Sequence, residues 1–332
     1  MPAIAPGSAT AEAHPNIALV KYWGKRDEAL NLPCVGSLSI TLDRIRTRTQ
    51  VTFVAGAGAD GVQLNGKTSE SARVGAGLDL LRARAGVDWR AEVVSDNNFP
   101  TAAGLASSAS GFAALMLAGA QALGLALPPG ELSALARRCS GSAARSIFGG
   151  FVEWARGECA DGRDSIAHPL LDRAEWPLAV AIAVTSVAAK SVSSTVGMRR
   201  TAATSPFQGA WVATQEADLA AARAAVAAHD FARLAEVSEH SCLKMHALAL
   251  AARPGLIYWN GATVACMHRV RELRGQGMPV FFTVDAGPQV KAVCLPEALP
   301  AVAAALREVP GVLEVIECGL GAGAHLVAGP HA

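Results

Sequence analysis

The chain has 332 residues, of which 51% are hydrophobic and 17% are charged, and its formal net charge is +1. A chain of this size can bury a large core and favours two lobes over one. The near-zero charge argues against binding to nucleic acid or to an anionic membrane surface. No uninterrupted apolar run reaches about 18 residues, so we expect no membrane span.

The N-terminus and the cysteines indicate a protein of a reducing compartment. Residues 1–13 lack a basic stretch followed by an apolar one, so we expect a loosely attached tail and no signal peptide. The seven cysteines contain no C-x-x-C pair, and the eight histidines show no H-E-x-x-H spacing. These patterns predict reduced thiols, a cytoplasmic location and no structural metal.

An apolar strand predicted at residues 17–20 ends abruptly in Lys-Tyr-Trp-Gly-Lys. The chain has only six lysines against 23 arginines, and two of the six, Lys21 and Lys25, lie four residues apart here. Compact ammonium groups retained in an arginine-rich chain indicate an anion contact. The alternative is a pair of solvated surface lysines.

The region up to residue 98 has mainly β-strand patterns and one helical pattern. Alternating β-branched residues predict strands at residues 37–42 and 50–54, with a further strand at residues 91–95. Residues 61–66 have the pattern of a short strand and turn. Residues 71–86 have helical spacing, with Val74, Leu78 and Leu81 on one side.

Residues 99–111 read FPTAAGLASSASG and lead into the apolar run FAALMLAGAQALGLAL, which predicts a buried helix. Small residues let the backbone approach a ligand, and the first turn of a helix offers unpaired N–H groups and a positive dipole end. Ser107 and Ser108 add hydroxyls that can hold a phosphate or a metal-bound water. The loop is neither a Walker A motif nor a dinucleotide fingerprint. A tightly packed helix start without a ligand is the alternative.

A second loop of small residues follows a predicted helix at residues 131–139 and precedes a predicted strand at residues 151–154. Its sequence is SGSAAR, from Ser140 to Arg145. Two hydroxyls and a guanidinium within six residues suit a carboxylate or phosphate clamp. A capping serine beside a surface arginine is the alternative.

Composition changes near residue 185, after an apolar strand predicted at residues 178–184. The second half reads as three helices, then strands and one more helix. The last strands surround Asp285, which stands at the end of a predicted buried strand and before a Gly-Pro turn, so it is held rigidly and can point into a cleft. The lone His246 is interpreted as a core or surface residue. The predicted helices are residues 208–228, 231–250, 263–275 and 297–307, and the strands are residues 280–284, 290–295 and 312–318.

Five motifs occur in order along the chain: NIALVKYWGK, NNFPTAAGLASSASGFAAL, SGSAARSIFGGFVEW, VSSTVGM and FTVDAGPQV. Together they closely resemble the diphosphomevalonate decarboxylase family of the GHMP small-molecule kinase superfamily. The resemblance covers residues 14–321. It implies an α+β fold of two lobes around a cleft, the first like domain 2 of ribosomal protein S5 and the second ferredoxin-like. We expect residues 1–185 to form the first lobe, with the ATP phosphate loop, and residues 186–332 to form the second.

The resemblance also implies the activity: ATP-dependent conversion of 5-diphosphomevalonate to isopentenyl diphosphate, with ADP, phosphate and CO₂, through phosphorylation of the 3-hydroxyl in the mevalonate pathway. ATP and Mg²⁺ would be the cofactors and a homodimer the assembly. Asp285 would orient and deprotonate the 3-hydroxyl, Lys21 would neutralise charge beside it, and Arg145 would hold the carboxylate.

Further positions follow from the same motifs. The implied substrate contacts are Tyr22, Lys25, Ser140, Ser142, Arg145 and Ser194. The implied ATP contacts are Pro100, Ala103, Gly104, Leu105, Ala106, Ser107 and Ser108, and the two serines also lie near Mg²⁺.

The chain departs from the family pattern at three places. The run Cys34-Val35-Gly36 replaces an Asn- or Ser-rich pair, Cys139 replaces a usual glycine, and Thr195 stands where bacterial relatives often have arginine. Two rivals keep the fold, a mevalonate 5-phosphate decarboxylase and a mevalonate 3-kinase. A third is a non-catalytic ligand-binding paralogue. The intact Asp285 and Arg145 favour decarboxylation.

Overall fold

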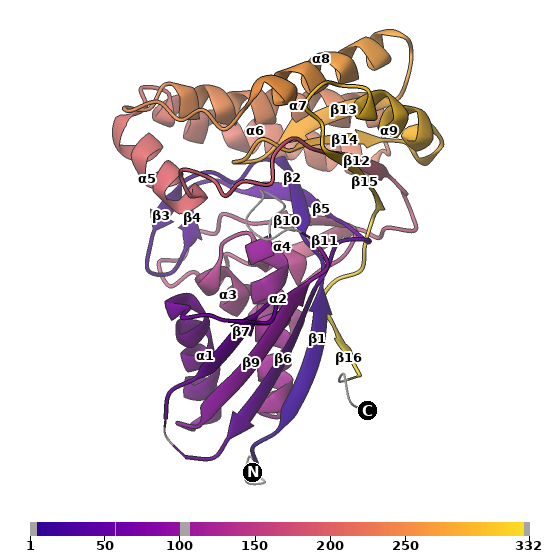
Figure 1. The fold of residues 1–332 in the computed structure, drawn as a ribbon. Coiled ribbons are helices and arrows are strands. Elements are labelled where there is room, and N and C mark those ends of the chain that lie inside the picture. The colour runs from indigo at the N-terminus through magenta and orange to yellow at the C-terminus, as the bar shows by residue number, and fades with distance from the viewer. Residues whose placement is uncertain (1–4, 57, 100–106, 329–332) are drawn as a thin grey trace.

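The computed structural model describes residues 5–56, 58–99 and 107–328 and has two lobes, one above the other in Figure 1. The first lobe joins a twisted sheet to helices, and the second carries helices α6, α7 and α8 across the top of the molecule. This mixed arrangement of helices and sheets is the predicted fold class. Among the described residues, no helix has the combination of length and hydropathy that a membrane span requires.

The sheet of the first lobe follows from alternation along its strands. Every second side chain of β6 is buried, and β9 has the same pattern, so one face of the sheet packs inward and the other meets solvent. The strand order is β16-β1-β6-β9-β7-β8. The bounds are β1 Ser8–Ala13, β6 Thr47–Val54, β7 Gly61–Leu64, β8 Lys67–Thr68, β9 Arg90–Asn97 and β16 His325–Val327.

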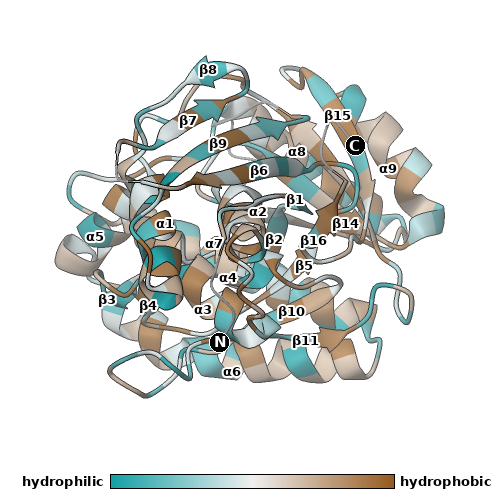
Figure 2. Cartoon of the chain, turned by 90° about the horizontal axis from the view of Figure 1, so that it is seen from below, coloured by the Kyte–Doolittle hydropathy of each residue, from teal (hydrophilic) through white to brown (hydrophobic). Residues whose placement is uncertain are grey.

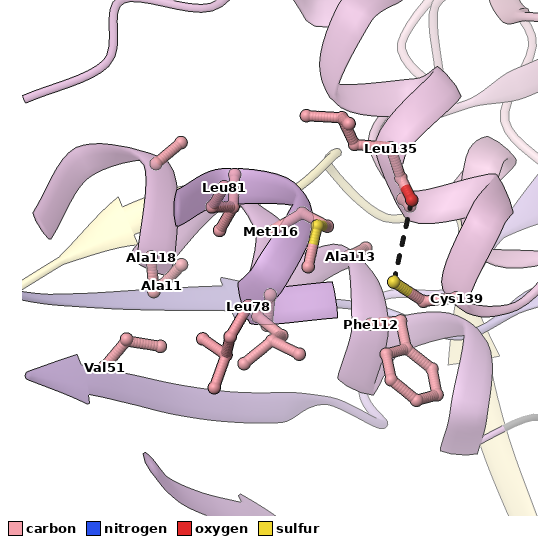
Figure 3. Packing of buried hydrophobic residues seen from close by; sticks show 14 of the residues in the cluster. Ala11, Val51, Leu78, Leu81, Phe112, Ala113, Met116, Ala118, Leu135 and Cys139 are labelled. Carbon is pink, nitrogen blue, oxygen red and sulfur yellow. Dashed lines mark hydrogen bonds between the residues drawn. The ribbon is translucent and has the colours of Figure 1, made fainter. Parts of the chain in front are cut away.

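Helices cover the inner face of this sheet, and Figure 2 shows α1 and α2 together on one side of it. Figure 3 shows the contact from close by, with Val51 of β6 beside Leu78 and Leu81 of α1 and Met116 of α2. Helix α1 starts where the Ser71 hydroxyl accepts from a backbone N–H and stops at a left-handed Gly86. The bounds are α1 Ala72–Ala85, α2 Ser107–Ala122 and α3 Pro129–Cys139.

A second sheet, in the order β11-β10-β5-β2, lies between the two lobes. The side chains of β2, β5 and β10 are buried, whereas the edge strand β11 is partly exposed. Ile17, Leu38 and Ile40 pack with the helices of the second lobe, and Val152 and Trp154 pack in a separate cluster with Ala144. A short hairpin and the single-turn helix α4 lie beside it. The bounds are β2 Asn16–Val20, β5 Ser37–Thr41, β10 Phe151–Trp154, β11 Ala167–Leu171, β3 Lys25–Asp27, β4 Leu32–Pro33 and α4 Ala143–Ser146.

The second lobe has an antiparallel sheet in the order β13-β14-β12-β15. Strand β12 shows why both faces are apolar: Ala181 packs in the cluster with α8 and α9, whereas Val180 and Ile182 pack in the cluster with β2 and β5. The strands are β12 Ala179–Val184, β13 Val280–Val284, β14 Val290–Cys294 and β15 Glu314–Gly319. The helices are α5 Ser194–Thr204, α6 Gln208–Ala227, α7 Phe231–Leu250, α8 Gly261–Gly275 and α9 Leu299–Arg307, the last preceded by a 3₁₀ turn at Pro296–Ala298.

The expectation of a loose tail at residues 1–13 is wrong for its second half. Residues Ser8–Ala13 form β1, which pairs with β6 on one side and with β16 on the other. Ala11 and Ala13 are fully buried against the helices. Small alanines gave a weak strand signal, and the pairing partners that stabilise β1 lie far along the chain.

The segment around residue 185 also differs from expectation in detail. Helix α5 was not predicted there, because its sequence is polar and β-branched. Strand β12 precedes the predicted boundary yet pairs with β14 and β15, and β16 returns to the first sheet. The division at residue 185 stays a prediction.

Candidate functional site

A cavity of about 730 Å³ lies between the lobes, and both of them line it. Its charged lining is strongly basic: seven lysines and arginines face two acidic residues. A cavity with this excess of positive charge attracts and holds polyanions. The basic residues are Lys21, Lys25, Arg73, Arg138, Arg145, Lys190 and Arg199, and the acidic ones are Glu28 and Asp285.

Lys21 and Asp285 form an ion pair in this cavity. The Lys21 Nζ donates to Asp285 Oδ1 at 2.6 Å. The backbone around Lys21 is fixed by the second lobe, because its N–H donates to the Ser241 hydroxyl and its carbonyl accepts from Gln215. The backbone is thus fixed where the chain leaves β2, and from there the ammonium group of Lys21 reaches Asp285, the residue after β13.

A second lysine holds the other oxygen of Asp285. Lys291 Nζ, from β14, lies 3.1 Å from Asp285 Oδ2. Burial alone would raise the pKa of the Asp285 carboxyl, but the ammonium groups of Lys21 and Lys291 outweigh it and hold that pKa well below its usual range. Asp285 is therefore a carboxylate at neutral pH, and its side chain keeps 27% of its surface exposed toward the cavity.

Arg145, on α4, is 2% exposed. Its Nη1 donates to the Ser37 hydroxyl at 2.6 Å and its Nε donates to Asn16 Oδ1 at 3.1 Å. Burial lowers the pKa of this guanidinium to about 10, so it remains charged. Within the described ranges it has no carboxylate partner closer than 4.0 Å, and a buried charge without one is ready to bind an anionic ligand. The surface-arginine alternative is excluded.

The two small-residue loops meet at the cavity. Ser140 donates to Ser108 Oγ at 3.4 Å, which joins the SGSAAR loop to the first turn of α2. Ser140, Ser142 and Ser108 all line the cavity. Gly141 lies between them and against Tyr22, where a Cβ atom would come 2.7 Å from the Tyr22 hydroxyl. Only glycine fits that contact without displacing the tyrosine.

Tyr22, Lys25 and Ser194 line the cavity as predicted. The Tyr22 hydroxyl is buried without a hydrogen-bond partner in the described part of the chain, and its ring packs edge-on against Trp154. Burial lowers the pKa of Lys25. Ser194 is the first residue of α5, whose N-terminal N–H groups face the same cavity.

The predicted ATP loop is described only at its end. Pro100, Ala103, Gly104, Leu105 and Ala106 lie outside the described residues. Ser107 begins α2 and Ser108 follows it at the cavity wall. The two candidate Mg²⁺ contacts therefore stand at a helix N-terminus next to the basic cavity.

Sequence reasoning missed Lys190 and Asn16, which line the cavity, and Lys291, which contacts Asp285 from outside the cavity lining. The two lysines could have been found from composition. The chain has only six lysines, so each of them indicates a position where a compact ammonium group is used in place of a guanidinium. Asn16 carried no comparable signal. Its Oδ1 accepts from Arg145, and its Nδ2 donates to the Ser142 carbonyl and the Ser146 hydroxyl, so it joins β2 to α4.

The three departures from the family pattern have distinct surroundings. The Cys34 thiol donates to the Trp23 carbonyl and is partly buried. Cys139 lines the cavity, and burial raises the pKa of its thiol to about 12, so it is not a nucleophile at neutral pH. Thr195 faces the cavity from α5.

Comparison with known proteins extends over nearly the whole chain. The diphosphomevalonate decarboxylase-like N-terminal domain matches residues 13–167, and the mevalonate 5-diphosphate decarboxylase C-terminal domain matches residues 180–318. The diphosphomevalonate decarboxylase of Aspergillus fumigatus is 40% identical over 325 residues, which cover 91% of this chain and 80% of that protein.

The chain belongs to the diphosphomevalonate decarboxylase family.

Solved structures of this family superpose closely on the fold described above. A mevalonate diphosphate decarboxylase from Staphylococcus aureus has a TM-score of 0.92 and 41% identity, covering 98% of this chain and 99% of its own. A structure described as MDDEF in complex with MVAPP, AMPPCP and magnesium has a TM-score of 0.90 and 42% identity, covering 98% of this chain and all of that one. The predicted family and its two-lobed GHMP-kinase-like fold are confirmed.

Proposed function

We propose that the chain catalyses the ATP-dependent decarboxylation of 5-diphosphomevalonate to isopentenyl diphosphate, releasing ADP, phosphate and CO₂. The observation that carries this function is the buried, uncompensated Arg145 in the same cavity as the Lys21–Asp285 pair. The pair fits phosphoryl transfer to a hydroxyl, and the buried guanidinium fits the carboxylate that the reaction removes. Family membership supplies the substrate class.

Asp285 and Lys21 act on the tertiary 3-hydroxyl. The ionised Asp285 accepts a hydrogen bond from that hydroxyl, which orients its oxygen for attack and takes its proton as the phosphoryl group arrives. Lys21 keeps Asp285 ionised and neutralises the oxygen. The low pKa of Asp285 makes it a weak base, so its main role is orientation. It accepts the proton only as the new P–O bond forms, because that bond makes the hydroxyl strongly acidic.

Arg145, Ser140 and Ser142 hold the substrate carboxylate. A guanidinium offers paired donors that match a carboxylate, and its position is fixed by Asn16 and Ser37. When phosphate departs from C3 with the C–O electron pair, C3 becomes electron-poor. The C–CO₂⁻ bond then breaks, and its electrons form the alkene while CO₂ leaves.

Tyr22, Lys25 and Ser194 bind the diphosphate end. The buried Tyr22 hydroxyl can donate a hydrogen bond to a phosphate oxygen, and Lys25 contributes a positive charge. Helix α5 contributes the positive end of its dipole and the Ser194 hydroxyl. Mevalonate 5-diphosphate carries its charge at this end, so these groups select for its length and charge.

The residues at the start of α2 fit ATP and Mg²⁺. The first N–H groups of α2 and the nearby cationic lining suit the phosphates of ATP. The hydroxyl oxygens of Ser107 and Ser108 suit Mg²⁺. When bound, ATP supplies the phosphoryl group and Mg²⁺ neutralises charge on its phosphates. Lys190, whose pKa is lowered by burial and by Lys291, lines the cavity close enough to Asp285 to interact with its charge, and it adds to the positive charge there.

One assay tests this function against its closest alternatives. The enzyme is incubated with ATP, Mg²⁺ and either mevalonate, its 5-phosphate or its 5-diphosphate, and both ADP and CO₂ are measured. We expect equal amounts of ADP and CO₂, with strong preference for the 5-diphosphate. Equal use of the 5-phosphate would indicate a monophosphate decarboxylase, ADP without CO₂ would indicate a 3-kinase, and no turnover would indicate a binding paralogue.

A homodimer in the cytoplasm is proposed from the family resemblance. All seven cysteines are free thiols, which fits a reducing compartment. Sedimentation velocity tests the assembly, and we expect a species of twice the 34.0 kDa of one chain. A single species at the mass of one chain would contradict the dimer.

A further inference from the structure

We propose that Lys291 is a positioning residue for Asp285: it fixes the second carboxylate oxygen so that the first faces Lys21 and the substrate hydroxyl. The inference rests on the proposed function. It assigns to a strand residue a role in catalysis that acts through Asp285, without contact to the substrate.

Strand pairing sets this geometry. In the β13–β14 register Lys291 stands opposite Thr283, two residues before Asp285. From there its Nζ reaches Asp285 Oδ2 at 3.1 Å, while Lys21 Nζ reaches Oδ1 at 2.6 Å from the other lobe. With each oxygen held by a different ammonium group, the carboxylate cannot rotate about its Cβ–Cγ bond without breaking one contact.

The burial of the three groups differs in a way that separates their roles. Lys291 is 2% exposed and Lys21 is 1% exposed, whereas the Asp285 side chain is 27% exposed. Asp285 is therefore the most exposed of the three groups, and Lys291 contacts it from the buried side. The cavity lining includes Lys21 and Asp285 and omits Lys291.

Burying the ammonium group of Lys291 at this position carries a desolvation penalty, which indicates that its charge has a specific role. Its neighbours in β14, Val290 and Ala292, are fully buried in an apolar strand. Burial lowers the pKa of Lys291, and the charge of Asp285 opposes that change. An apolar side chain would pack here without the desolvation penalty of an ammonium group.

Every element packed around Asp285 contributes to its electrostatic surroundings. Cationic groups face it from three sides: Lys21 after β2, Arg145 on α4, and Lys190 in the segment before α5. Helix α7 contributes Cys242 and His246, which stay neutral because burial raises the pKa of the thiol and lowers that of the imidazole to about 4. Lys291 therefore adds a directed contact to a region that is already cationic.

The experiment compares Lys291→Met and Lys291→Arg with the parent enzyme. Met removes the charge at similar length, and Arg keeps it. The matched control is Lys244→Met, which removes the lysine of another partly buried ion pair, with Asp218, away from the cavity. The readouts are kcat and KM for the 5-diphosphate, ADP and CO₂ yields, and the acid limb of the pH–kcat profile.

We expect Lys291→Met to lower kcat by about 10- to 100-fold with KM changed by less than about threefold, because a misplaced carboxylate loses the attack geometry. Its acid limb should move to higher pH by at least about one unit, because Asp285 has lost one of the charges that lower its pKa. Lys291→Arg should recover part of both effects, and Lys244→Met should match the parent.

A readout without turnover separates this inference from the proposed function. In protein labelled with ¹³C at the Asp carboxyls, the Asp285 resonance is assigned by its loss in Asp285→Asn and titrated in parent and Lys291→Met. An upward shift of its pKa in the variant supports the role of Lys291 whichever substrate the enzyme uses. An unchanged pKa of Asp285 in Lys291→Met would overturn the proposed role of Lys291. A loss of activity in proportion to the unfolded fraction, with the acid limb of the pH–kcat profile at its parental position, would also overturn it.

Discussion

Lys21 and Asp285 are separated by 264 positions in the sequence, and their side chains meet at 2.6 Å across the boundary between the lobes. Lys21 is anchored by α6 and α7 through Gln215 and Ser241, and Asp285 leaves the same lobe at the end of β13. Both residues of the pair are therefore held by elements of the second lobe, even though the lysine belongs to the first lobe by sequence. Predictions for this pair and its surroundings follow from that arrangement.

Replacing Asp285 by Asn keeps the shape of the side chain and removes its charge. We expect turnover to fall by at least about 10²-fold with KM within a few-fold, because the hydroxyl loses its charged acceptor. Steady-state ADP release measures the change, and circular dichroism verifies folding. Asp218→Asn, which disrupts an ion pair outside the cavity, is the control. A folded Asp285→Asn enzyme with near-parental turnover would exclude the assignment.

Replacing Arg145 by Lys keeps the charge and loses the planar fork. The lost hydrogen bonds to Asn16, Ser37 and the substrate carboxylate should lower kcat/KM by an amount equivalent to about 1.5–3 kcal/mol. ADP and CO₂ should fall together. Arg223→Lys, at a half-exposed ion pair with Glu153, should leave the kinetics unchanged. Parental kinetics in Arg145→Lys would show that the guanidinium does not hold substrate.

Replacing Lys25 by Ala removes a point charge from the proposed diphosphate end. We expect KM for the 5-diphosphate to rise more than KM for the 5-phosphate, since the second phosphate carries the extra charge. Part of the loss can reach kcat, because remote binding energy helps to position the reacting centre. Kinetics on both substrates measure the difference, with Lys67→Ala on the exposed β8 as control. An equal rise in KM for the two substrates would show that Lys25 does not contact the second phosphate.

The buried His246 should make the unfolding free energy of the protein depend on pH. Its ring is 2% exposed, its Nε2 donates to the Val284 carbonyl at 3.2 Å, and burial lowers its pKa to about 4. The unfolded imidazole titrates near the ordinary value of about 6.5. Between these values the unfolded chain binds a proton that the folded chain does not. The stability that neutral His246 contributes is therefore complete above pH about 6.5 and is lost as the pH falls.

The test compares the parent with His246→Gln, which keeps a donor for the Val284 carbonyl and does not titrate. Between pH about 7 and about 5 the parent should lose up to about 2 kcal/mol more unfolding free energy than the variant. Urea unfolding at both pH values measures the difference, with the exposed His240→Gln as control. Identical pH dependence in parent and His246→Gln would mean that the folded ring titrates normally.

Elements with local signals could be predicted from the sequence. Helix α7 and strands β10 and β13 have the predicted bounds, and α1 lies within its predicted caps, because periodicity, capping groups and turn residues act within a few positions. Motif order likewise identified the family and placed Tyr22, Lys25, Ser140, Ser142, Arg145, Ser194 and Asp285 in one site, and all of them line the cavity.

Features that depend on partners distant in the chain could not be predicted from local signals. Strand β1 exists because β6 and β16 pair with it, and the weak local preference of its alanines is overridden by that pairing. Arg145, on α4, is buried rather than exposed, and its side chain donates to Asn16 of β2 and Ser37 of β5. Lys291 meets Asp285 through the β13–β14 register, and Lys21 meets the same carboxylate across the lobe boundary. Hydrogen-bond register and burial are set by three-dimensional packing, and a single sequence records neither of them directly.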